Sequence, residues 1–368
     1  MKKLLLSICL VMLCLVKANA QEPKLVSTEP SNRNVLIEEL TGRNCGYCPW
    51  GQYFVNQTIK KNPGRVFTVN IHKQSSLSPT SYPNLNTLKG GDIATAFNKD
   101  GSLPEAMVNR NEEESVGLST TQNWWDKMTT EQLNQTAECN IAGTVSINPE
   151  TRLARITVEV YYTADSKVEN NYLTVIMLQD SILGSQSGTE YNEEQMVGEQ
   201  YCHMHVYRNT ITDKWGDAIS PTTAGTLITE TYKYTIPESI GSPNGVDVDL
   251  NNVHFLAFVT EHQSSGAKTM PILNVCKLEH VEHGLSVEEN VESTSCIYPN
   301  PVKDVLTITA DDVKRVVMYN SLGQIVKSIE ANDDNLKIDV SDLENGMYFV
   351  NIIDNNENVI TNKVAVNK

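Results

Sequence analysis

Two cysteines separated by two residues stand between a predicted strand and a predicted helix, and this placement restricts the local fold more than any other feature of the sequence. The cysteines are Cys45 and Cys48, and an apolar run at residues 35–40 precedes them. A helix is predicted at residues 49–61, where an Asn-Pro-Gly sequence ends it. A second apolar strand is predicted at residues 65–72. The order strand, cysteine pair, helix, strand indicates an α/β unit.

The position of this cysteine pair favours redox chemistry. The free N–H groups and the dipole at a helix N-terminus stabilise a thiolate. We therefore expect Cys45, as the exposed first cysteine, to attack disulfides. Cys48, inside the helix, is expected to be the buried thiol that resolves the mixed disulfide.

The N-terminus has the features of a secretory signal peptide over residues 1–20. Two lysines precede an apolar run at residues 4–16, and the sequence Ala-Asn-Ala that ends at Ala20 has the small residues of a cleavage site. No other stretch approaches the roughly 20 apolar residues of a membrane-spanning helix. Export would place the mature chain in an oxidising compartment, where disulfides are permitted. The formal net charge of −16 argues against nucleic acid as a partner.

The length of 368 residues predicts several domains of an α+β protein. The α/β unit is expected at residues 21–136, and its last helix at residues 121–135. Residues 137–283 alternate like an antiparallel β-sandwich, with strands predicted at residues 156–162, 172–178, 227–236, 253–260 and 272–276. A polar linker at residues 284–295 leads to a small all-β domain at residues 296–368.

Three short motifs mark the C-terminal domain. They are Tyr-Pro-Asn-Pro at residues 298–301, Tyr-Asn-Ser-Leu-Gly-Gln at residues 319–324 and Leu-Glu-Asn-Gly-Met-Tyr-Phe at residues 343–349. With them, residues 296–368 resemble the C-terminal sorting domain of the Bacteroidetes type IX secretion system. The resemblance implies handling by the type IX translocon and its sortase, followed by surface anchoring or release. The alternative is a plain β domain that binds carbohydrate or packs on the sandwich.

The α/β unit resembles thioredoxin-like proteins. In that family an acid lies in the strand six residues before the first cysteine, and Glu39 has this position, which implies that it accepts the proton of Cys48. The family also keeps a cis proline against the cysteine pair, and Pro104 has the matching place. Glu38 is expected to point to the opposite face and to be solvated. The Gly-Tyr dipeptide between the cysteines resembles that of periplasmic disulfide isomerases and implies a less reducing pair.

A wider resemblance covers roughly residues 33–283. The segment at residues 35–49 and the sequence Cys-His-Met-His-Val-Tyr-Arg at residues 202–208 resemble the outer membrane protein 28 family. This resemblance implies a thioredoxin-like domain followed by a β-sandwich, a surface location and adhesin-like roles. It does not by itself imply an enzyme.

Two functions follow from these patterns. The first is a secreted or surface thiol–disulfide oxidoreductase or isomerase that acts on protein thiols and disulfides, with Cys45, Cys48, Glu39 and Pro104 as its site. The sandwich would then orient substrate or form a homodimer. The second is a surface binding or adhesion protein in which the two cysteines form a structural disulfide. No cofactor is predicted for either function.

Other clusters give weaker signals. Cys202, His203 and His205 suggest metal ligands, because alternate residues of a strand share a face, so His203 and His205 would converge. Only two ligands are aligned in this way. A third ligand could come from His254, His262, His280 or His283, but strand histidines are more often packed or solvated, and no metal site is predicted. A cysteine protease is set aside because Cys48 would trap the nucleophile. Four further cysteines remain: Cys139, Cys202, Cys276 and Cys296. They allow three sets of disulfide pairings, which the sequence cannot rank.

Overall fold

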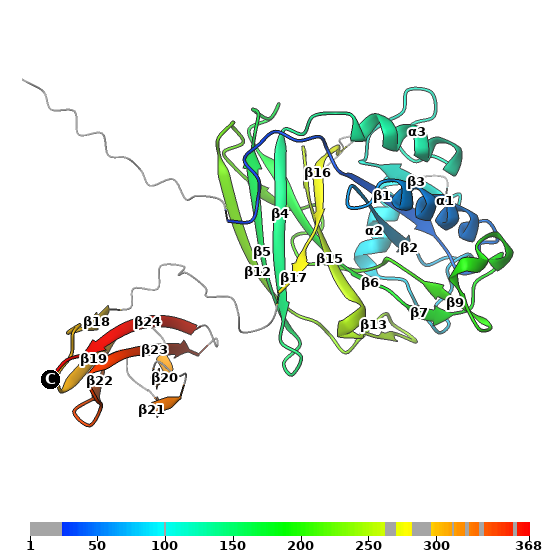
Figure 1. Cartoon of the computed structure of the whole chain (residues 1–368). Helices are drawn as coiled ribbons and strands as arrows, with labels where there is room; N and C mark the ends of the chain where they lie inside the picture. Colours follow the sequence, from blue (N-terminus) through cyan, green and yellow to red (C-terminus); the bar gives the residue numbers. More distant parts are fainter. Residues whose placement is uncertain are drawn as a thin grey trace, which may run out of the picture. The chain divides into compact units, whose positions relative to one another are not determined.

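A computed structural model of the protein divides into two compact units, Met1–Val281 and Glu282–Lys368, which are described separately here (Figure 1). The predicted signal peptide and the linker lie outside the described residues. The structure describes residues 24–98, 101–261, 270–281, 296–310, 313–320, 324–330, 335–355 and 359–368.

A mixed sheet of eight strands runs through the first unit. Its order is β16-β15-β6-β10-β2-β1-β3, and β11 also pairs with β6. β1 and β10 both run parallel to β2, which lies between them, and the other pairs are antiparallel. The bounds are β1 Val35–Thr41, β2 Val66–His72, β3 Glu105–Val108, β6 Asn171–Gln179, β10 Val206–Thr210, β11 Asp217–Ile219, β15 Val253–Thr260 and β16 Ile272–Lys277.

This sheet continues across the predicted boundary at residue 136. β2 comes from the predicted α/β domain and β10 from the predicted sandwich, and the two strands are hydrogen-bonded. Asn70 donates its backbone N–H to the His205 carbonyl at 2.8 Å and its side-chain amide to the Met204 carbonyl at 2.8 Å. The boundary therefore lies inside one compact unit, and the division into two domains stays a proposal.

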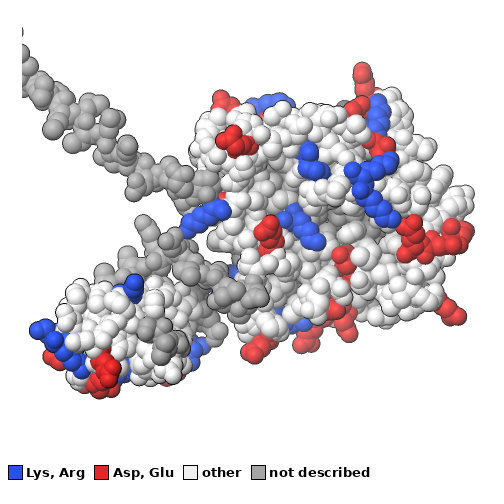
Figure 2. Space-filling view, in the orientation of Figure 1, with Lys and Arg blue, Asp and Glu red and all other residues white. Residues whose placement is uncertain are grey.

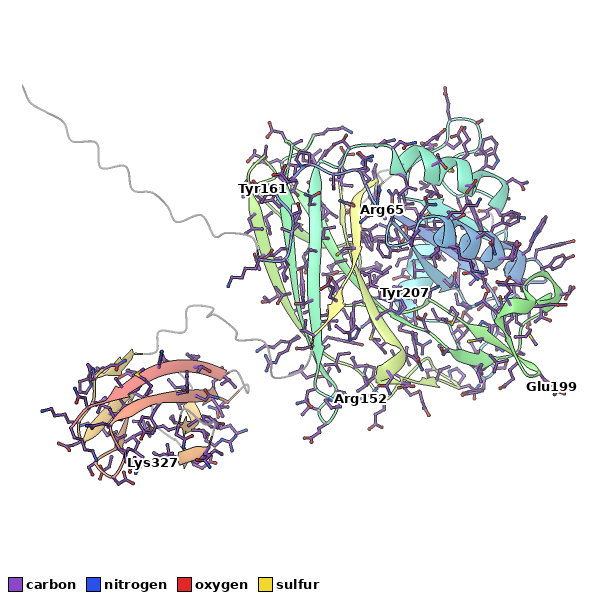
Figure 3. The ribbon with its side chains drawn as sticks, in the orientation of Figure 1. Arg65, Arg152, Tyr161, Glu199, Tyr207 and Lys327 are labelled. Atoms are coloured by element: carbon purple, nitrogen blue, oxygen red, sulfur yellow. A yellow bond between two sulfur atoms is a disulfide. The ribbon has the colours of Figure 1, made fainter. Side chains whose placement is uncertain are left out.

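Three helices cover the β1–β3 part of the sheet. Successive side chains of a strand point to opposite faces. Ile37 therefore shares one core with Val55 of α1 and Trp125 of α3, whereas Leu36 shares the opposite core with Ile93 of α2. Tyr207, labelled in Figure 3, lies in this second core. The helices are α1 Cys48–Lys61, α2 Leu88–Phe97 and α3 Gln122–Leu133.

A four-stranded sheet of order β12-β5-β4-β17 packs on the other part of the large sheet. Val145 and Val158 from this sheet share a core with Val175, Phe255 and Leu273 from the large sheet. The pairs of β12, β5 and β4 are antiparallel and β17 is parallel to β4. The α+β class with several sheets is confirmed. The bounds are β4 Cys139–Ile147, β5 Leu153–Tyr162, β12 Leu227–Thr235 and β17 Glu279–His280.

Between β6 and β10 the chain leaves the large sheet. We call residues 181–204 the excursion. It forms a three-stranded sheet of order β7-β9-β8, and Glu199 marks the tip of its β8–β9 hairpin at the edge of the unit (Figure 3). Its elements are β7 Ile182–Gly184, the 3-10 turns Thr189–Tyr191 and Glu193–Gln195, β8 Met196–Val197 and β9 Gln200–His203. Outside it, the unit contains β13 Ser239–Ile240, β14 Val246–Asp247 and the 3-10 turn Leu250–Asn252.

The second unit is all-β, as predicted. One sheet has the order β18-β19-β22 and the other β21-β20-β23-β24. Leu306 and Ile308 of the first sheet share a core with Val316, Met318 and Val350 of the second. The bounds are β18 Cys296–Tyr298, β19 Val305–Thr309, β20 Val313–Tyr319, β21 Ile325–Glu330, β22 Asn335–Asp339, β23 Gly346–Asp354 and β24 Val359–Val366.

Two surface properties bear on the choice of partner. In the part of the chain that the structure describes, no helix is long and apolar enough to cross a membrane. Figure 2 shows acidic and basic side chains interspersed over uncharged areas on the visible face of the first unit. A continuous basic surface of the kind that binds nucleic acid is not present on that face.

Candidate functional site

Cys45 and Cys48 form a disulfide at the start of α1, with their Cα atoms 5.4 Å apart. Cys48 is the first residue of the helix, Pro49 follows it, and the N-cap residue Tyr47 makes no side-chain capping bond. The first turn carries no acidic residue, whereas Lys60 and Lys61 lie in the last turn. The positive end of the helix dipole is therefore available to a thiolate at the cysteine pair.

Cys45 is buried, which corrects the expectation of an exposed first cysteine. Its exposed fraction is 4% and that of Cys48 is 0%. The cause is part of the excursion, residues 185–191, which we call the cap. The Gln186 side-chain amide donates to the carbonyls of Gly42 at 3.2 Å and Cys45 at 3.1 Å, and the Ser187 N–H donates to the Arg43 carbonyl at 2.8 Å.

A glycine of the cap packs against Gly46, between the two cysteines. Gly188 has a φ of +73°, and a Cβ atom at this position would collide with the carbonyl oxygen of Gly46. Glycine alone adopts this conformation freely and leaves room for the Gly46 backbone. The cap is also held at its start, because the buried Arg43 donates to Ser185 Oγ at 2.7 Å and to the Ser81 carbonyl at 2.8 Å.

Aromatic side chains form a surface beside the capped pair. Tyr191 of the cap lies 5.7 Å from Tyr47 and 6.0 Å from Trp50, measured between ring centroids. Tyr47 is 58% exposed, and Trp50 and Tyr53 are partly exposed. Large aromatic rings that stay open to solvent are typical of binding surfaces.

Glu39 is buried without a partner. Its exposed fraction is 0%, and neither carboxylate oxygen has a hydrogen-bond partner in the described structure. Burial raises the pKa of Glu39 well above its usual value, because a charged carboxylate is disfavoured in an apolar environment. Most buried polar groups are hydrogen-bonded, so an isolated carboxyl group calls for a functional explanation.

Glu39, Gly51 and Pro104 meet beneath the first turn of α1. Gly51 lies three residues after Cys48, and a Cβ atom on Gly51 would be 3.0 Å from Glu39 Oε1 and 3.0 Å from the ring of Pro104. The Leu103–Pro104 peptide bond is cis, as the resemblance implied. The structure therefore brings Glu39 and Pro104 together next to the helix that carries the cysteine pair.

A narrow recess lies beside Glu39, and it leaves no room for a water molecule. Most of the residues that line it are polar, and His205, whose side chain is 28% exposed, is among them. Glu39 therefore lies in polar but tightly packed surroundings. The residues that line it are Glu39, Gln52, Val55, Asn56, Thr68, Asn70, Gln195, Met204 and His205.

Glu38 is also buried, and the expectation that it is solvated is wrong. Arg110 donates to it twice, from Nε to Oε2 at 2.6 Å and from Nη2 to Oε1 at 2.7 Å. The guanidinium group lies over the rings of Phe97 at 4.9 Å and Phe258 at 5.3 Å. Glu38 thus points into the core on the α2 side, where an ion pair satisfies its charge.

Three further cysteines that the structure describes are unpaired. Cys139, Cys202 and Cys276 are free thiols. Burial raises the pKa of Cys139 and of Cys276 to about 12, so both stay protonated and unreactive. Cys296 lies in β18, and its side chain is outside the described part of the structure.

His203 and His205 do not converge, contrary to the expectation from strand alternation. His203 is buried against Tyr201 and His72, with centroid distances of 5.3 Å and 6.2 Å. The strand β9 ends at His203, and His205 has a φ of +53° that turns its side chain toward Asp180. The left-handed residue breaks the two-residue period on which the expectation depended.

The sequence matches "Outer membrane protein Omp28" over residues 93–282 and "Secretion system C-terminal sorting domain" over residues 296–367. With the disulfide at the start of α1, these matches define a class: a secreted or cell-surface protein of an outer-membrane family that carries a C-terminal sorting domain. The chain belongs to the outer membrane protein Omp28 family. The matched segment begins after Cys48, so membership alone says nothing about the cysteine pair.

Similar structures come from Porphyromonas gingivalis. HBP35 has a TM-score of 0.54 and 21% identity, and the match covers 92% of this chain and 99% of HBP35. It supports a shared fold. A domain of the outer membrane lipoprotein Omp28 has 16% identity and a TM-score of 0.26, over 40% of this chain and 90% of that domain.

Curated relatives match over short segments. Beta-agarase A of Zobellia galactanivorans is 39% identical over 72 residues, which are 19% of this chain and 13% of the relative. Ulvan lyase NLR42 of Nonlabens ulvanivorans is 33% identical over 86 residues, which are 23% and 16% of the two chains. The chain thus spans less than a fifth of the length of these relatives.

Proposed function

We propose that this protein is a cell-surface thiol–disulfide oxidoreductase or isomerase in which Cys45 exchanges with substrate and Cys48 resolves. The topology supports a thioredoxin-like assignment. β1, α1, β2, α2, β3 and α3 follow one another along the chain, with the sheet order β2-β1-β3. Ala106 of β3 also forms an isolated antiparallel bridge with Thr120, just before α3.

The observation that carries the proposal is the unpartnered carboxyl group of Glu39. A structural disulfide has no need of a buried acid, and leaving such a group unsatisfied costs about 1–3 kcal/mol. The cost is explained if Glu39 donates a proton to the resolving thiol Cys48 and accepts it back.

The proposed exchange conserves disulfide bonds and protons. A substrate thiolate attacks Cys45 Sγ, the Cys45–Cys48 bond breaks, and the leaving Cys48 sulfur takes the proton that Glu39 holds at its raised pKa. A second substrate thiolate then attacks the substrate sulfur and releases Cys45. In isomerisation the Cys45 thiolate attacks and is released again, so no net source of electrons is needed.

Substrate must displace the cap to reach Cys45. The hydrogen bonds given above between the cap and residues 42–45 end on backbone carbonyls, and an extended substrate segment can replace them with its own backbone N–H groups. Tyr47, Trp50 and Tyr191 would then contact apolar side chains of the substrate. We therefore propose unfolded or misoxidised exported proteins as the substrate class.

The test is refolding of a scrambled disulfide protein by the mature chain, residues 21–368. We expect Cys45→Ser to abolish activity and Glu39→Gln to lower the rate about 10²-fold or more, the usual contribution of positioned proton transfer. Cys202→Ser, which removes a half-buried thiol outside the site, is the matched control and should keep full activity. Equal rates for Cys45→Ser and Cys202→Ser would exclude the proposed enzyme.

A second candidate is a surface binding protein with a structural disulfide. The 4% exposure of Cys45 and the aromatic surface next to it favour this alternative. It predicts no exchange activity in any variant, together with loss of ligand binding in Trp50→Ala. The type IX machinery handles the sorting domain in both cases, whereas homodimer formation stays a proposal.

A further inference from the structure

Three potential metal ligands meet where the excursion leaves and rejoins the large sheet. β6 ends at Gln179 and pairs with β10 on one side and with β15 on the other. Asp180 directly follows β6, His205 directly precedes β10, and His254 belongs to β15. Residues 180, 205 and 254, far apart in the sequence, are therefore placed together by the topology of the sheet.

We propose that Asp180, His205 and His254 form a zinc-binding site. One oxygen of Asp180 lies 3.3 Å from His205 Nδ1, and its other oxygen lies 3.3 Å from His254 Nδ1. All the ligand atoms of the group lie within 4.8 Å of one another. Ligands at about 2.0–2.2 Å from a tetrahedral zinc ion are separated by about 3.3–3.6 Å, so these side chains need small adjustments only.

The backbone holds the ligands in position. The His205 N–H donates to Asp180 Oδ1 at 2.6 Å, and the left-handed conformation of His205 directs its ring toward the carboxylate. The rings of His205 and His254 face one another edge to face, with centroids 5.6 Å apart. Such contacts fix the orientation of metal-binding side chains before the ion arrives.

The exposure of the group suits an exchangeable ion. The side chain of His254 is 9% exposed, and those of Asp180 and His205 are 21% and 28% exposed. Three protein ligands with solvent on one side leave a coordination position for water, as in open zinc sites. Two imidazoles with one carboxylate also exclude Mg²⁺ and Ca²⁺, which prefer oxygen ligands throughout.

The choice of zinc over iron follows from the compartment. An exported protein meets oxidising conditions, under which Zn²⁺ keeps one oxidation state and Fe²⁺ does not.

Zinc at this position would connect the residue before the excursion with the residue after it. The ion would therefore close the base of the segment that carries the cap, and this role does not depend on any exchange activity.

The test uses the full mature chain after removal of metals with a chelator. Titration with Zn²⁺ should show one site by calorimetry, and Co²⁺ should give the visible absorption bands of a four- or five-coordinate ion. The melting temperature should rise with the Zn²⁺ concentration. His254→Gln should weaken binding by at least about 100-fold, since loss of an outer-shell partner alone costs 10–100-fold.

Two further variants make the test decisive. Glu150→Gln removes an exposed carboxylate in the turn between β4 and β5 that is not in the group, and it should leave zinc affinity unchanged. If His254→Gln does not fold, His205→Gln replaces a more exposed ligand and should show the same loss. The proposal is overturned if the metal-free protein binds no zinc at micromolar concentrations, or if both ligand variants bind zinc as the parent protein does.

Discussion

Glu38 and Glu39 follow one another in β1, and strand alternation sends their side chains into opposite cores. Glu38 meets Arg110 in a two-bond ion pair. Glu39 lies against Gly51, as Pro104 does, and has no hydrogen-bond partner. Glu38 is therefore part of a structural ion pair, whereas Glu39, on our account, carries a proton.

The two glutamates predict opposite effects of the same substitution. In the folded protein the raised pKa keeps Glu39 protonated, while the unfolded chain loses this proton near the ordinary value of 4.5. The folded state then binds more protons above that pH, so the free energy of unfolding falls as pH rises. Glu39→Gln should remove this fall and be more stable than the parent at pH 8.

Urea unfolding between pH 4 and pH 8 measures this difference. The two proteins should be similar in stability near pH 4 and diverge as pH rises. Glu38→Gln is the matched control, and it should lose about 3–5 kcal/mol because it leaves Arg110 buried without its partner. Parallel pH dependences in the parent protein and Glu39→Gln would contradict an ionisable, unpartnered Glu39.

The resemblance to thioredoxin-like proteins could place Glu39, but no sequence pattern could place the partner of Glu38. Glu39 is positioned by its distance from the cysteines within one strand and turn. Arg110 lies 72 residues from Glu38, and it reaches the α2 side through two left-handed residues, Asn109 and Arg110, at the end of β3. Local patterns do not predict such a turn, so the ion pair could not be foreseen.

At the scale of elements, helix α1 and the cap together control the cysteine pair. α1 begins at Cys48, one residue before its predicted start. The apolar strand and Pro49 are local signals, so the sequence could place this boundary closely. No local sequence pattern predicts the position of the cap. It belongs to an excursion of short strands and 3-10 turns, and its position depends on hydrogen bonds to residues 42–45, about 140 positions earlier in the chain.

The cap predicts how fast the disulfide is reduced. Gly188→Ala would place a methyl group against the Gly46 carbonyl, and overpacking of this kind costs about 1–3 kcal/mol. We expect the cap to open and the rate of reduction by dithiothreitol to rise roughly tenfold or more. Gly198→Ala is the matched control, since Gly198 also has a positive φ but has open space around it. Equal rates for both variants would show that the cap does not limit access.

At the scale of the whole molecule, the bounds of a strand were easier to predict than the strand with which it pairs. β15 begins and ends at the predicted residues, because alternation and apolar runs are local properties. The pairing of β2 with β10 is not local, and it joins two predicted domains in one sheet. The C-terminal unit was predictable as a whole, since its strands pair within residues 296–368.

The central claim, that Cys45 and Cys48 exchange with substrate, is tested most directly by the reduction potential of this pair. The measurement uses the mature protein equilibrated in glutathione buffers, with the two states separated by thiol labelling. Our account predicts a potential above about −230 mV, in the range of exchange catalysts. A potential below about −300 mV would mark the bond as a structural disulfide and contradict the account.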